Sequence, residues 1–241
     1  MGTIGARGQA ASEGVEVESK ERTCRGRAAA IPGPCADPLS RRTLPRMGLP
    51  PMKPHRATYA DLEAVPANQV AELIAGTLYA MPRPASAHAV ASSALTMEIG
   101  SPFQRGRGGP GGWWILAEPE LHFPDPTEPD AIDALVPDLA GWRRERMPKV
   151  PRVAAFTLAP DWICEVLSPS TEEHDREVKM PVYARERVRH AWLLDPIARL
   201  LEVYTLDAQG RWSEPVIHRD VEGVRAPLFE AIELDLSALW T

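Results

Sequence analysis

The run over residues 162–167, Trp-Ile-Cys-Glu-Val-Leu, constrains the fold of this chain more than any other segment. A short apolar run of this length is typical of a buried strand. Glu165 interrupts the run with a carboxylate. Burying an ionised carboxylate in such a strand is costly unless the group is paired or bound to a metal, so this position is the first sign of a functional site.

The segments from Thr58 onward alternate between strand-like and helix-like patterns. Thr58 or Asp61 is expected to cap a short helix that ends before Pro66, because the residue before a proline disfavours the helical region. Residues 71–81 suit two strands joined by a tight turn at Gly76. Helices are expected over residues 86–98 and 171–187, and further strands over residues 113–123, 134–142, 161–167, 190–195, 200–206 and 212–218. Strands outnumber helices, which predicts an α/β or α+β fold with helices packed on a sheet.

Residues 1–56 differ in composition from the remainder of the 241-residue chain. They hold ten basic residues, five acidic residues and seven prolines, with no sustained helical or strand period. This composition predicts a flexible leader, followed by one domain over residues 57–241. Met47 and Met52 lie just before the first patterned segment, so either is a candidate for the true start.

The charge balance limits the functions that the predicted domain can have. The chain carries a formal charge of -6, and the leader has a net charge of +5, which leaves -11 for the domain. Such an acidic domain offers no long-range attraction for nucleic acid. No stretch approaches the roughly 18 continuous apolar residues of a membrane span, and no apolar secretory block begins the chain, so a cytoplasmic protein without a membrane partner is expected.

A second carboxylate stands at the start of another apolar strand. Asp138 follows Pro137 and precedes the apolar residues 139–142. Asp175 and Lys179 lie four residues apart in the helix predicted after the strand that holds Glu165, so they share one helix face. These charged groups are the first candidates for a site at the strand ends.

Taken in order, these pieces resemble the Uma-two family of restriction endonucleases over residues 57–206. The resemblance rests on Pro137-Asp138, on residues 161–167 running into Ser168-Pro169-Ser170-Thr171, and on Asp175, Lys179 and Tyr183. Supporting pieces are Glu72-Leu73-Ile74 with Gly76, the segment from Met81-Pro82 to His88, and Trp192-Leu193-Leu194-Asp195-Pro196. Because the pieces occur in a consistent order, the match is more specific than any single motif.

The resemblance implies the restriction-endonuclease-like core of the PD-(D/E)XK superfamily, in which helices flank a central mixed sheet. The usual pattern places a lysine two residues after the glutamate, but Glu165 is followed by Val166 and Leu167. Lys179 is the nearest replacement, and a lysine on a neighbouring helix can reach the same space as one on the strand. Pro181 would remove a helical hydrogen bond close to that lysine.

The implied activity is that of a metal-dependent DNA endonuclease that hydrolyses phosphodiester bonds. Asp138, Glu165 and the backbone carbonyl of Val166 are expected to hold one hard divalent cation, Mg2+ in the first place and Mn2+ as a substitute. The metal would acidify a bound water and neutralise charge on the scissile phosphate. Lys179 would orient that water or stabilise the transition state.

Four further residues receive supporting roles in this interpretation. The resemblance suggests Glu72 as an additional carboxylate, either outside the immediate metal ligands or on a second metal. Asp175 is expected to hold Lys179 in place. His88 matches a family position, yet a lone histidine after a loop is more often a hydrogen-bonding or capping group than a ligand. Tyr183 follows Lys179 by four residues.

Each assignment has a structural alternative. Asp138 after a proline also fits a turn residue, and Lys179 also fits a simple pair with Asp175 on a solvated helix face. Glu72 fits a solvent-facing strand residue equally well. Glu165 is the hardest to explain in this way, because carboxylates rarely occupy apolar strands without a partner.

A basic cluster follows the strand that begins after Asp138. Its members are Arg143, Arg144, Arg146, Lys149 and Arg152. They could clamp a phosphate backbone near the metal, or they could form an ordinary exposed loop that its charge keeps soluble. Cutting both strands of a duplex needs two sites, which would favour a homodimer, although no residue indicates one.

Functions of different classes therefore remain open. The first is a Mg2+-dependent DNA endonuclease. The second is a catalytically weak or inactive protein of the same fold that binds nucleic acid or a protein partner and keeps Asp138 and Glu165 as structural or metal-binding groups. A third is a metal-dependent hydrolase of some other phosphorylated molecule. Lys179 separates the first two, because its removal should abolish Mg2+-dependent cleavage only in a nuclease.

Overall fold

The computed structural model describes residues 55–220 and 223–240. The leader predicted over residues 1–56 lies outside these residues, apart from His55 and Arg56. Arg56 donates a hydrogen bond to Thr127 Oγ1 at 3.1 Å and forms an ion pair with Asp125. The side chain of Arg56 is therefore attached to the domain, whose fold begins at the short helix α1, Tyr59–Glu63.

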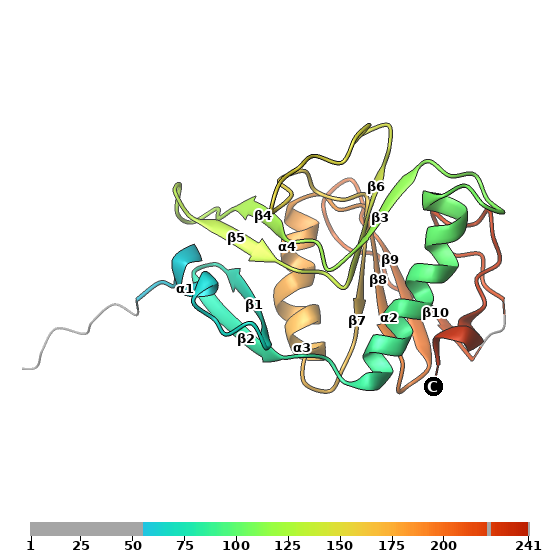
Figure 1. Ribbon diagram of the computed structural model, residues 1–241, viewed down its shortest axis with the longest axis horizontal. Helices are drawn as coiled ribbons and strands as arrows, with labels where there is room; N and C mark the ends of the chain where they lie inside the picture. The colour runs from blue at the N-terminus through green and yellow to red at the C-terminus, as the bar shows by residue number, and fades with distance from the viewer. Residues whose placement is uncertain (1–54, 221–222, 241) are drawn as a thin grey trace, which may run out of the picture. The chain divides into compact units, whose positions relative to one another are not determined.

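A six-stranded mixed sheet forms the centre of the described residues (Figure 1). Its strand order is β10-β9-β8-β7-β6-β3, and β7 and β8 form its single parallel pair among the described strands. The strands are β3 Trp113–Ala117, β6 Leu139–Arg143, β7 Trp162–Val166, β8 His190–Asp195, β9 Leu200–Thr205 and β10 Val216–Arg219. Every residue of β7 is buried, as the apolar run predicts for a central strand.

A smaller antiparallel sheet with strand order β2-β1-β5-β4 contains the remaining strands. Its members are β1 Gln69–Ile74, β2 Thr77–Pro82, β4 Leu121–Pro124 and β5 Ile132–Leu135. The predicted tight turn between β1 and β2 consists of Ala75 and Gly76, with φ angles of 51° and 73°. Two consecutive left-handed residues match the twist of a hairpin, which explains the glycine at this position. A side chain at Gly76 would also collide with the guanidinium of Arg56.

Two predicted strands are each divided between the two sheets. The strand expected over residues 113–123 is β3 followed by β4, and the one expected over residues 134–142 is β5 followed by β6. Glu118 breaks the first with a φ of 46°, and Pro137 breaks the second, since proline cannot donate a sheet hydrogen bond. The second break matters most, because it places Asp138 in the gap between the two sheets.

The helices follow the predicted pattern with one local difference. Thr58 caps α1 through a capping box with Asp61. The other helical segments are α2 Ser86–Ile99 with the π-helical turn η1 Gly100–Gln104, then α3 Glu172–His174, the π-helical turn η2 Asp175–Lys179 and α4 Met180–Arg185, and the 3-10 turn η3 Leu236–Leu239. The wide turn η2 ends two residues before Pro181, whose missing N–H cannot donate a helical hydrogen bond back into this turn. Within residues 55–220 and 223–240, no helix is long and apolar enough to cross a membrane.

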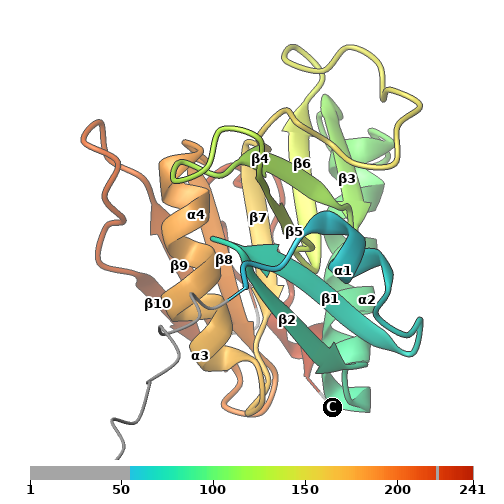
Figure 2. The ribbon, with the colours of Figure 1, turned by 90° about the vertical axis from the view of Figure 1, so that its left-hand side faces the viewer.

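Side chains of β7 alternate between two hydrophobic cores. Trp162, Cys164 and Val166 pack with α2 and the C-terminal residues 224–239. Ile163 packs on the other face, against α4 and the smaller sheet. Figures 1 and 2 show α4 and the smaller sheet together on this side of the six-stranded sheet. Strand alternation places Glu165 on this second face, beneath the smaller sheet and the helical segment α3–α4.

An ion-pair network ties that helical segment to β9. Arg176 Nη1 and Nη2 donate to the carboxylate of Glu202 at 2.7 and 2.8 Å, and Tyr204 donates to the same carboxylate at 2.5 Å. Burial alone would raise the pKa of Glu202, but the hydrogen bonds from Arg176 and Tyr204 lower it below its usual value. Glu202 therefore stabilises the fold in its ionised form.

Replacing Glu202 with glutamine is expected to lower the free energy of unfolding by about 1–3 kcal/mol near neutral pH, because a charged acceptor is lost. The folded-state pKa of Glu202 lies below its unfolded value. Its contribution is therefore fully present above a pH of about 4.3 and is lost as the pH falls through the folded-state pKa. The free energies of unfolding of wild type and Glu202→Gln, measured in urea, should become equal at strongly acidic pH. A difference that stays constant down to a pH of about 3 would contradict this role.

Candidate functional site

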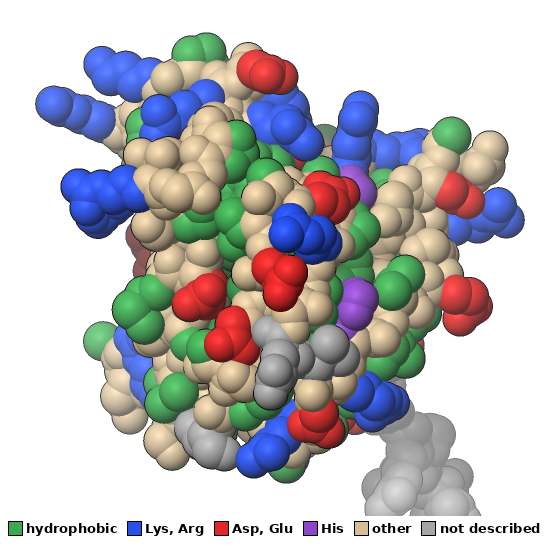
Figure 3. Space-filling model, turned by 90° about the vertical axis from the view of Figure 1, so that its right-hand side faces the viewer, with side chains coloured by type: hydrophobic (Ala, Val, Ile, Leu, Met, Phe, Trp, Pro, Cys, Tyr) green, Lys and Arg blue, Asp and Glu red, His purple; other side chains and the backbone are tan. Residues whose placement is uncertain are grey.

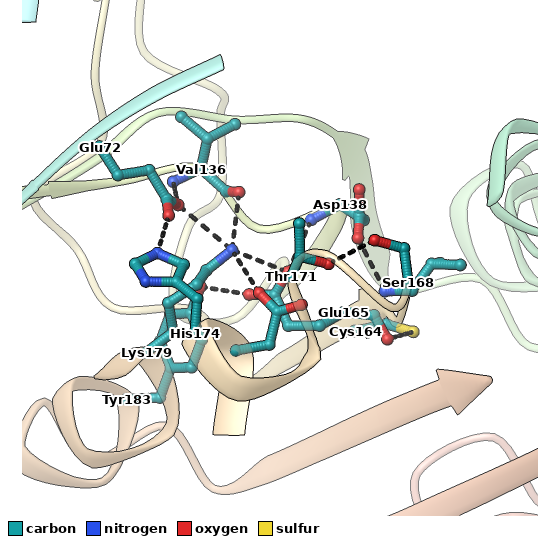
Figure 4. Close-up of polar contacts among 12 residues, drawn as sticks. Glu72, Val136, Asp138, Cys164, Glu165, Ser168, Thr171, His174, Lys179 and Tyr183 are labelled. Carbon is teal, nitrogen blue, oxygen red and sulfur yellow. Dashed lines mark hydrogen bonds and ion pairs between the residues drawn. The ribbon is translucent and has the colours of Figure 1, made fainter. Parts of the chain in front are cut away.

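Asp138 and Glu165 lie side by side at one end of the six-stranded sheet (Figure 4). Leu139 of β6 is opposite Cys164 of β7 in an antiparallel pair, so the residue before Leu139 stands beside the residue after Cys164. The backbone N–H of Asp138 lies 3.4 Å from Glu165 Oε2, and the N–H of Val166 donates to Asp138 Oδ2 at 2.7 Å. The structure thus brings together two acids that are far apart in the sequence.

Lys179 places its ammonium at the centre of the site (Figure 4). Its Nζ lies 2.9 Å from Glu165 Oε2, 3.2 Å from Glu72 Oε1 and 3.4 Å from Asp175 Oδ1. It also donates to the carbonyl oxygen of Val136 at 3.2 Å. A helical lysine therefore reaches the glutamate of the strand. The alternative in which Lys179 lies on a solvated helix face is wrong, because only 4% of its side chain is exposed.

One face of the helical segment carries three site residues at four-residue spacing, Asp175, Lys179 and Tyr183. The hydroxyl of Tyr183 donates to Glu165 Oε1 at 2.6 Å. The two oxygens of Glu165 are thus held separately, one by Tyr183 and the other by Lys179. Arg176 lies on a different face of the helical segment and donates to Glu202 of β9. This contact keeps the face with Asp175, Lys179 and Tyr183 turned toward Glu165.

Glu72 enters the site from β1 and is fully buried. Its Oε1 accepts the N–H of Val136 at 2.7 Å, and its Oε2 lies 2.6 Å from His174 Nε2. The alternative of a solvent-facing strand residue is therefore wrong. Strand β1 belongs to the smaller sheet, so the site is assembled from both sheets and the helical segment.

Two histidines contact the acids. His88, in the first turn of α2, places Nε2 at 3.0 Å from Asp138 Oδ1. This contact fits the hydrogen-bonding role that the sequence suggests for His88. His174 was not predicted as a site residue, since its partner Glu72 is 102 residues away and no local spacing links them. Its ring also packs against Tyr79, with the ring centroids 4.4 Å apart.

A pocket of about 310 Å³ opens over these groups. Its charged lining includes Glu72, His88, Asp138, Glu165, Asp175 and Lys179, with Arg83, Glu118 and Glu120 also contributing. A pocket of this size has ample room for an ion and several waters, since one water needs only about 10–15 Å³. The two acids are therefore not sealed in a core without space.

Negative charge exceeds positive charge in the site. The carboxylates of Glu72, Glu165 and Asp175 contact Lys179, and a fourth carboxylate, that of Asp138, lines the same pocket. Burial raises the pKa of Glu165 well above its usual value, and Asp175 and Asp138 raise it further against the effect of Lys179. An additional cation would relieve this excess of buried negative charge.

The other buried groups respond to the same charges. Burial alone would lower the pKa of Lys179, but the charges of Glu165 and Glu72 outweigh it and raise this pKa well above its usual value. Burial also acts to raise the pKa of Glu72, yet Lys179 and the hydrogen bonds from His174 and Val136 lower it. Lys179 is therefore a cation and Glu72 a carboxylate at neutral pH.

A hard divalent cation fits this donor set by chemistry and by charge, because carboxylate oxygens are the ligands that Mg2+ prefers. Among the described residues, no group of three or more His, Cys, Asp or Glu side chains forms a preformed ligand cluster. The oxygens of Asp138 and Glu165 are instead hydrogen-bonded by the chain itself. Each carboxylate oxygen can accept a further contact, so both acids can still serve as ligands. A ligand role for the carbonyl of Val166 stays a prediction.

The basic cluster predicted near the metal is not brought to this pocket. Arg143 ends β6 and Asp138 precedes it, so they lie at opposite ends of a five-residue strand about 17 Å long. None of Arg143, Arg144, Arg146, Lys149 and Arg152 lines the pocket. Arg144 stacks on Trp114, 4.1 Å from the ring centroid, and Arg146 pairs with Asp161 at 2.9 Å. The hypothesis that these residues clamp a phosphate backbone near the metal is therefore wrong. Strand β6 runs away from the pocket and places them at or beyond its far end.

The sequence comparison agrees with the resemblance seen in the individual motifs. Residues 56–237 match the Uma2 family, which is described as "Putative restriction endonuclease". This chain belongs to the Uma2 family. The match extends past residue 206 into the C-terminal residues that pack with α2. No curated protein matches the sequence of this Uma2 chain.

A solved structure supports the fold of this Uma2 chain. It is the crystal structure of "a putative nuclease belonging to DUF820" from Anabaena variabilis ATCC 29413. The two structures agree with a TM-score of 0.60 at 21% sequence identity, over 76% of this chain and 97% of that chain. The predicted fold class, a mixed sheet flanked by helices, is therefore confirmed.

Proposed function

We propose that this protein is a Mg2+-dependent DNA endonuclease that hydrolyses phosphodiester bonds. The observation that carries the proposal is the position of Lys179, whose Nζ lies 2.9 Å from Glu165 Oε2. Glu165 in turn lies beside Asp138, and both acids line the same pocket. In this proposal the helix would supply the lysine that the strand lacks after Glu165. Membership of the Uma2 family supports the choice of a nuclease.

The chain's own residues would have distinct roles in this reaction. A divalent cation held by Asp138 and Glu165 would supply an acidified water and neutralise charge on the phosphate. Lys179 would stabilise the negative charge that develops on the phosphate, acting as a cation because the surrounding carboxylates hold its pKa high. A protonated ammonium cannot accept a proton, so Lys179 is not the general base. Tyr183 and His88 would keep Glu165 and Asp138 oriented.

A catalytically weak or inactive protein of this fold, binding nucleic acid or a protein partner, is the second candidate. One observation favours it: Lys179 is in contact with three carboxylates and a carbonyl oxygen of its own chain. In this role the same contacts would serve stability alone. A reacting phosphate would have to displace part of this network to reach the ammonium.

The test is a cleavage assay of the full chain on supercoiled plasmid, on an oligonucleotide and on a small phosphoester. Each substrate is incubated with Mg2+, with Mn2+ or with a chelator. The proposal predicts cleavage of the two DNA substrates with either metal and none with the chelator. Turnover of the small phosphoester alone would favour the third function, a hydrolase of other phosphorylated molecules. Binding of DNA without cleavage by any metal would favour the second candidate.

A further inference from the structure

A second charged hollow lies at the end of the six-stranded sheet opposite the candidate active site. It has a volume of about 590 Å³, and Arg143, Arg146, Arg187, Arg189 and His190 supply its basic lining. An adjoining hollow of about 490 Å³ shares the last three of these residues. We call the combined hollow, defined by these four arginines and His190, the arginine groove.

Sheet register explains why these residues meet. β6 ends at Arg143, and β8 begins at His190, directly after Arg187 and Arg189. Trp162 of β7 is paired with Gly141 on one side and with His190 on the other, so the end of β6 and the start of β8 share one edge. Figure 3 shows Lys and Arg side chains gathered along the upper margin of one face, the level at which the loop after β6 runs in Figure 1.

Positive charge in the arginine groove is only partly compensated. The lining of its two hollows includes three carboxylates, those of Glu145, Asp161 and Asp207. Asp207 forms an ion pair with Arg211 at 3.1 Å. Asp161 is already engaged, since it pairs with Arg146 at 2.9 Å and accepts the backbone N–H of Arg143 at 2.8 Å. Within the part of the chain that the structure describes, no carboxylate lies within ion-pair distance of Arg143, Arg187 or Arg189.

The local arrangement of these guanidinium groups leaves them available for a ligand. Arg143 stacks over Trp113 at 4.7 Å, a contact that positions the guanidinium without neutralising it. Arg187 donates to the carbonyl oxygen of Ala208 at 3.3 Å, and Arg189 is exposed. Four arginines from two segments thus line one hollow in a domain whose sequence is otherwise strongly acidic.

We propose that the arginine groove binds consecutive phosphates of a nucleic-acid backbone. It would contact the substrate at a distance from the phosphate that is cleaved. Guanidinium groups match phosphate oxygens in a bidentate manner. Two adjoining hollows that share arginines suit a chain of phosphates better than one isolated anion. The choice of nucleic acid as ligand rests on the proposed nuclease function, whereas the phosphate chemistry rests on the groove alone.

The double variant Arg187→Gln/Arg189→Gln tests this proposal. Binding of a fluorescent duplex oligonucleotide is measured by anisotropy at several salt concentrations in the presence of a chelator, so that cleavage does not interfere. Because each phosphate contact contributes about 0.9 to the slope of log K against log salt, removing two contacts should reduce that slope by about 1.8 and weaken binding. Arg219→Gln is the matched control, since Arg219 is exposed on β10 and lines neither hollow.

Competition by inorganic phosphate and by a nucleoside triphosphate separates the sources of the ligand. An unchanged slope in the double variant would overturn the proposal. If the double variant lost binding of the triphosphate but bound DNA as wild type does, the proposal would also be overturned. The ligand of the groove would then be a free nucleotide. A reduced slope in a protein that cleaves no DNA would leave the groove standing and reject the nuclease. Normal plasmid cleavage with an unchanged slope would reject the groove alone.

Discussion

Glutamine in place of Glu165 is expected to raise the free energy of unfolding of the metal-free protein while abolishing Mg2+-dependent cleavage. The carboxylate lies in a fully buried strand near three other acids, and its surroundings raise its pKa in spite of Lys179. Glutamine keeps the shape but removes the charge. Its amide oxygen can accept from Lys179, while its NH2 group donates to the hydroxyl oxygen of Tyr183. Because the fold disfavours the ionised form, a neutral group at this position should stabilise the metal-free protein at pH values above the folded-state pKa of Glu165. The gain should disappear as the pH falls below the usual pKa of a glutamate.

Cleavage should fall by at least about 100-fold in Glu165→Gln, since a metal ligand contributes several kcal/mol to transition-state stabilisation. Unfolding in urea with a chelator present measures the stability, and the plasmid assay measures the activity. Glu202→Gln is the matched control, because the same substitution at a buried, arginine-paired glutamate should lower stability and keep cleavage. A loss of stability in Glu165→Gln would mean that the carboxylate is a structural ion-pair partner.

Replacing Lys179 with methionine is expected to have the largest effect on stability. Methionine has a similar length but no charge, so Glu72, Glu165 and Asp175 would lose the ammonium that contacts all three. Removing one partner from a buried ion-pair cluster costs about 3–5 kcal/mol. Mg2+-dependent cleavage should also be lost, because Lys179 supplies the positive charge beside the phosphate.

Reduced folding must be separated from lost chemistry in Lys179→Met. Cleavage is therefore expressed per folded molecule, with the folded fraction taken from circular dichroism. Asp133→Asn serves as a destabilised control, since Asp133 is fully buried and binds Arg185 and the N–H of Ala75 outside the site. The control should cut DNA normally when corrected for folding. Corrected activity of Lys179→Met equal to wild type would remove Lys179 from the mechanism.

The central strand and its carboxylate were predictable because their signal is local. An acid within an apolar run predicts both burial and a partner, and Glu165 has both. Four-residue spacing likewise predicts that Asp175 and Lys179 share a helix face, which they do. These features depend on residues that are close in the sequence. The periods of helices and strands predict which of such residues share a face.

Other features depend on how distant segments meet, and they were less visible in the sequence. The burial of Glu72 and its contact with His174 arise from packing the smaller sheet over the helical segment. The basic residues after β6 looked close to Asp138 in sequence, but an extended strand separates them in space. Arg187 and Arg189 joined that cluster only through the pairing of β7 with β8.

Calorimetric titration of Mn2+ or Mg2+ into the full chain tests the central claim most directly. One divalent cation should bind the wild-type protein, and binding should be lost in Asp138→Asn, which removes the charge of one acid while its amide oxygen can still accept the N–H of Val166. Lys149→Ala, a change at an exposed lysine outside the pocket, should bind normally. Absence of binding to wild type, or equal binding to Asp138→Asn, would contradict a metal site formed by Asp138 and Glu165.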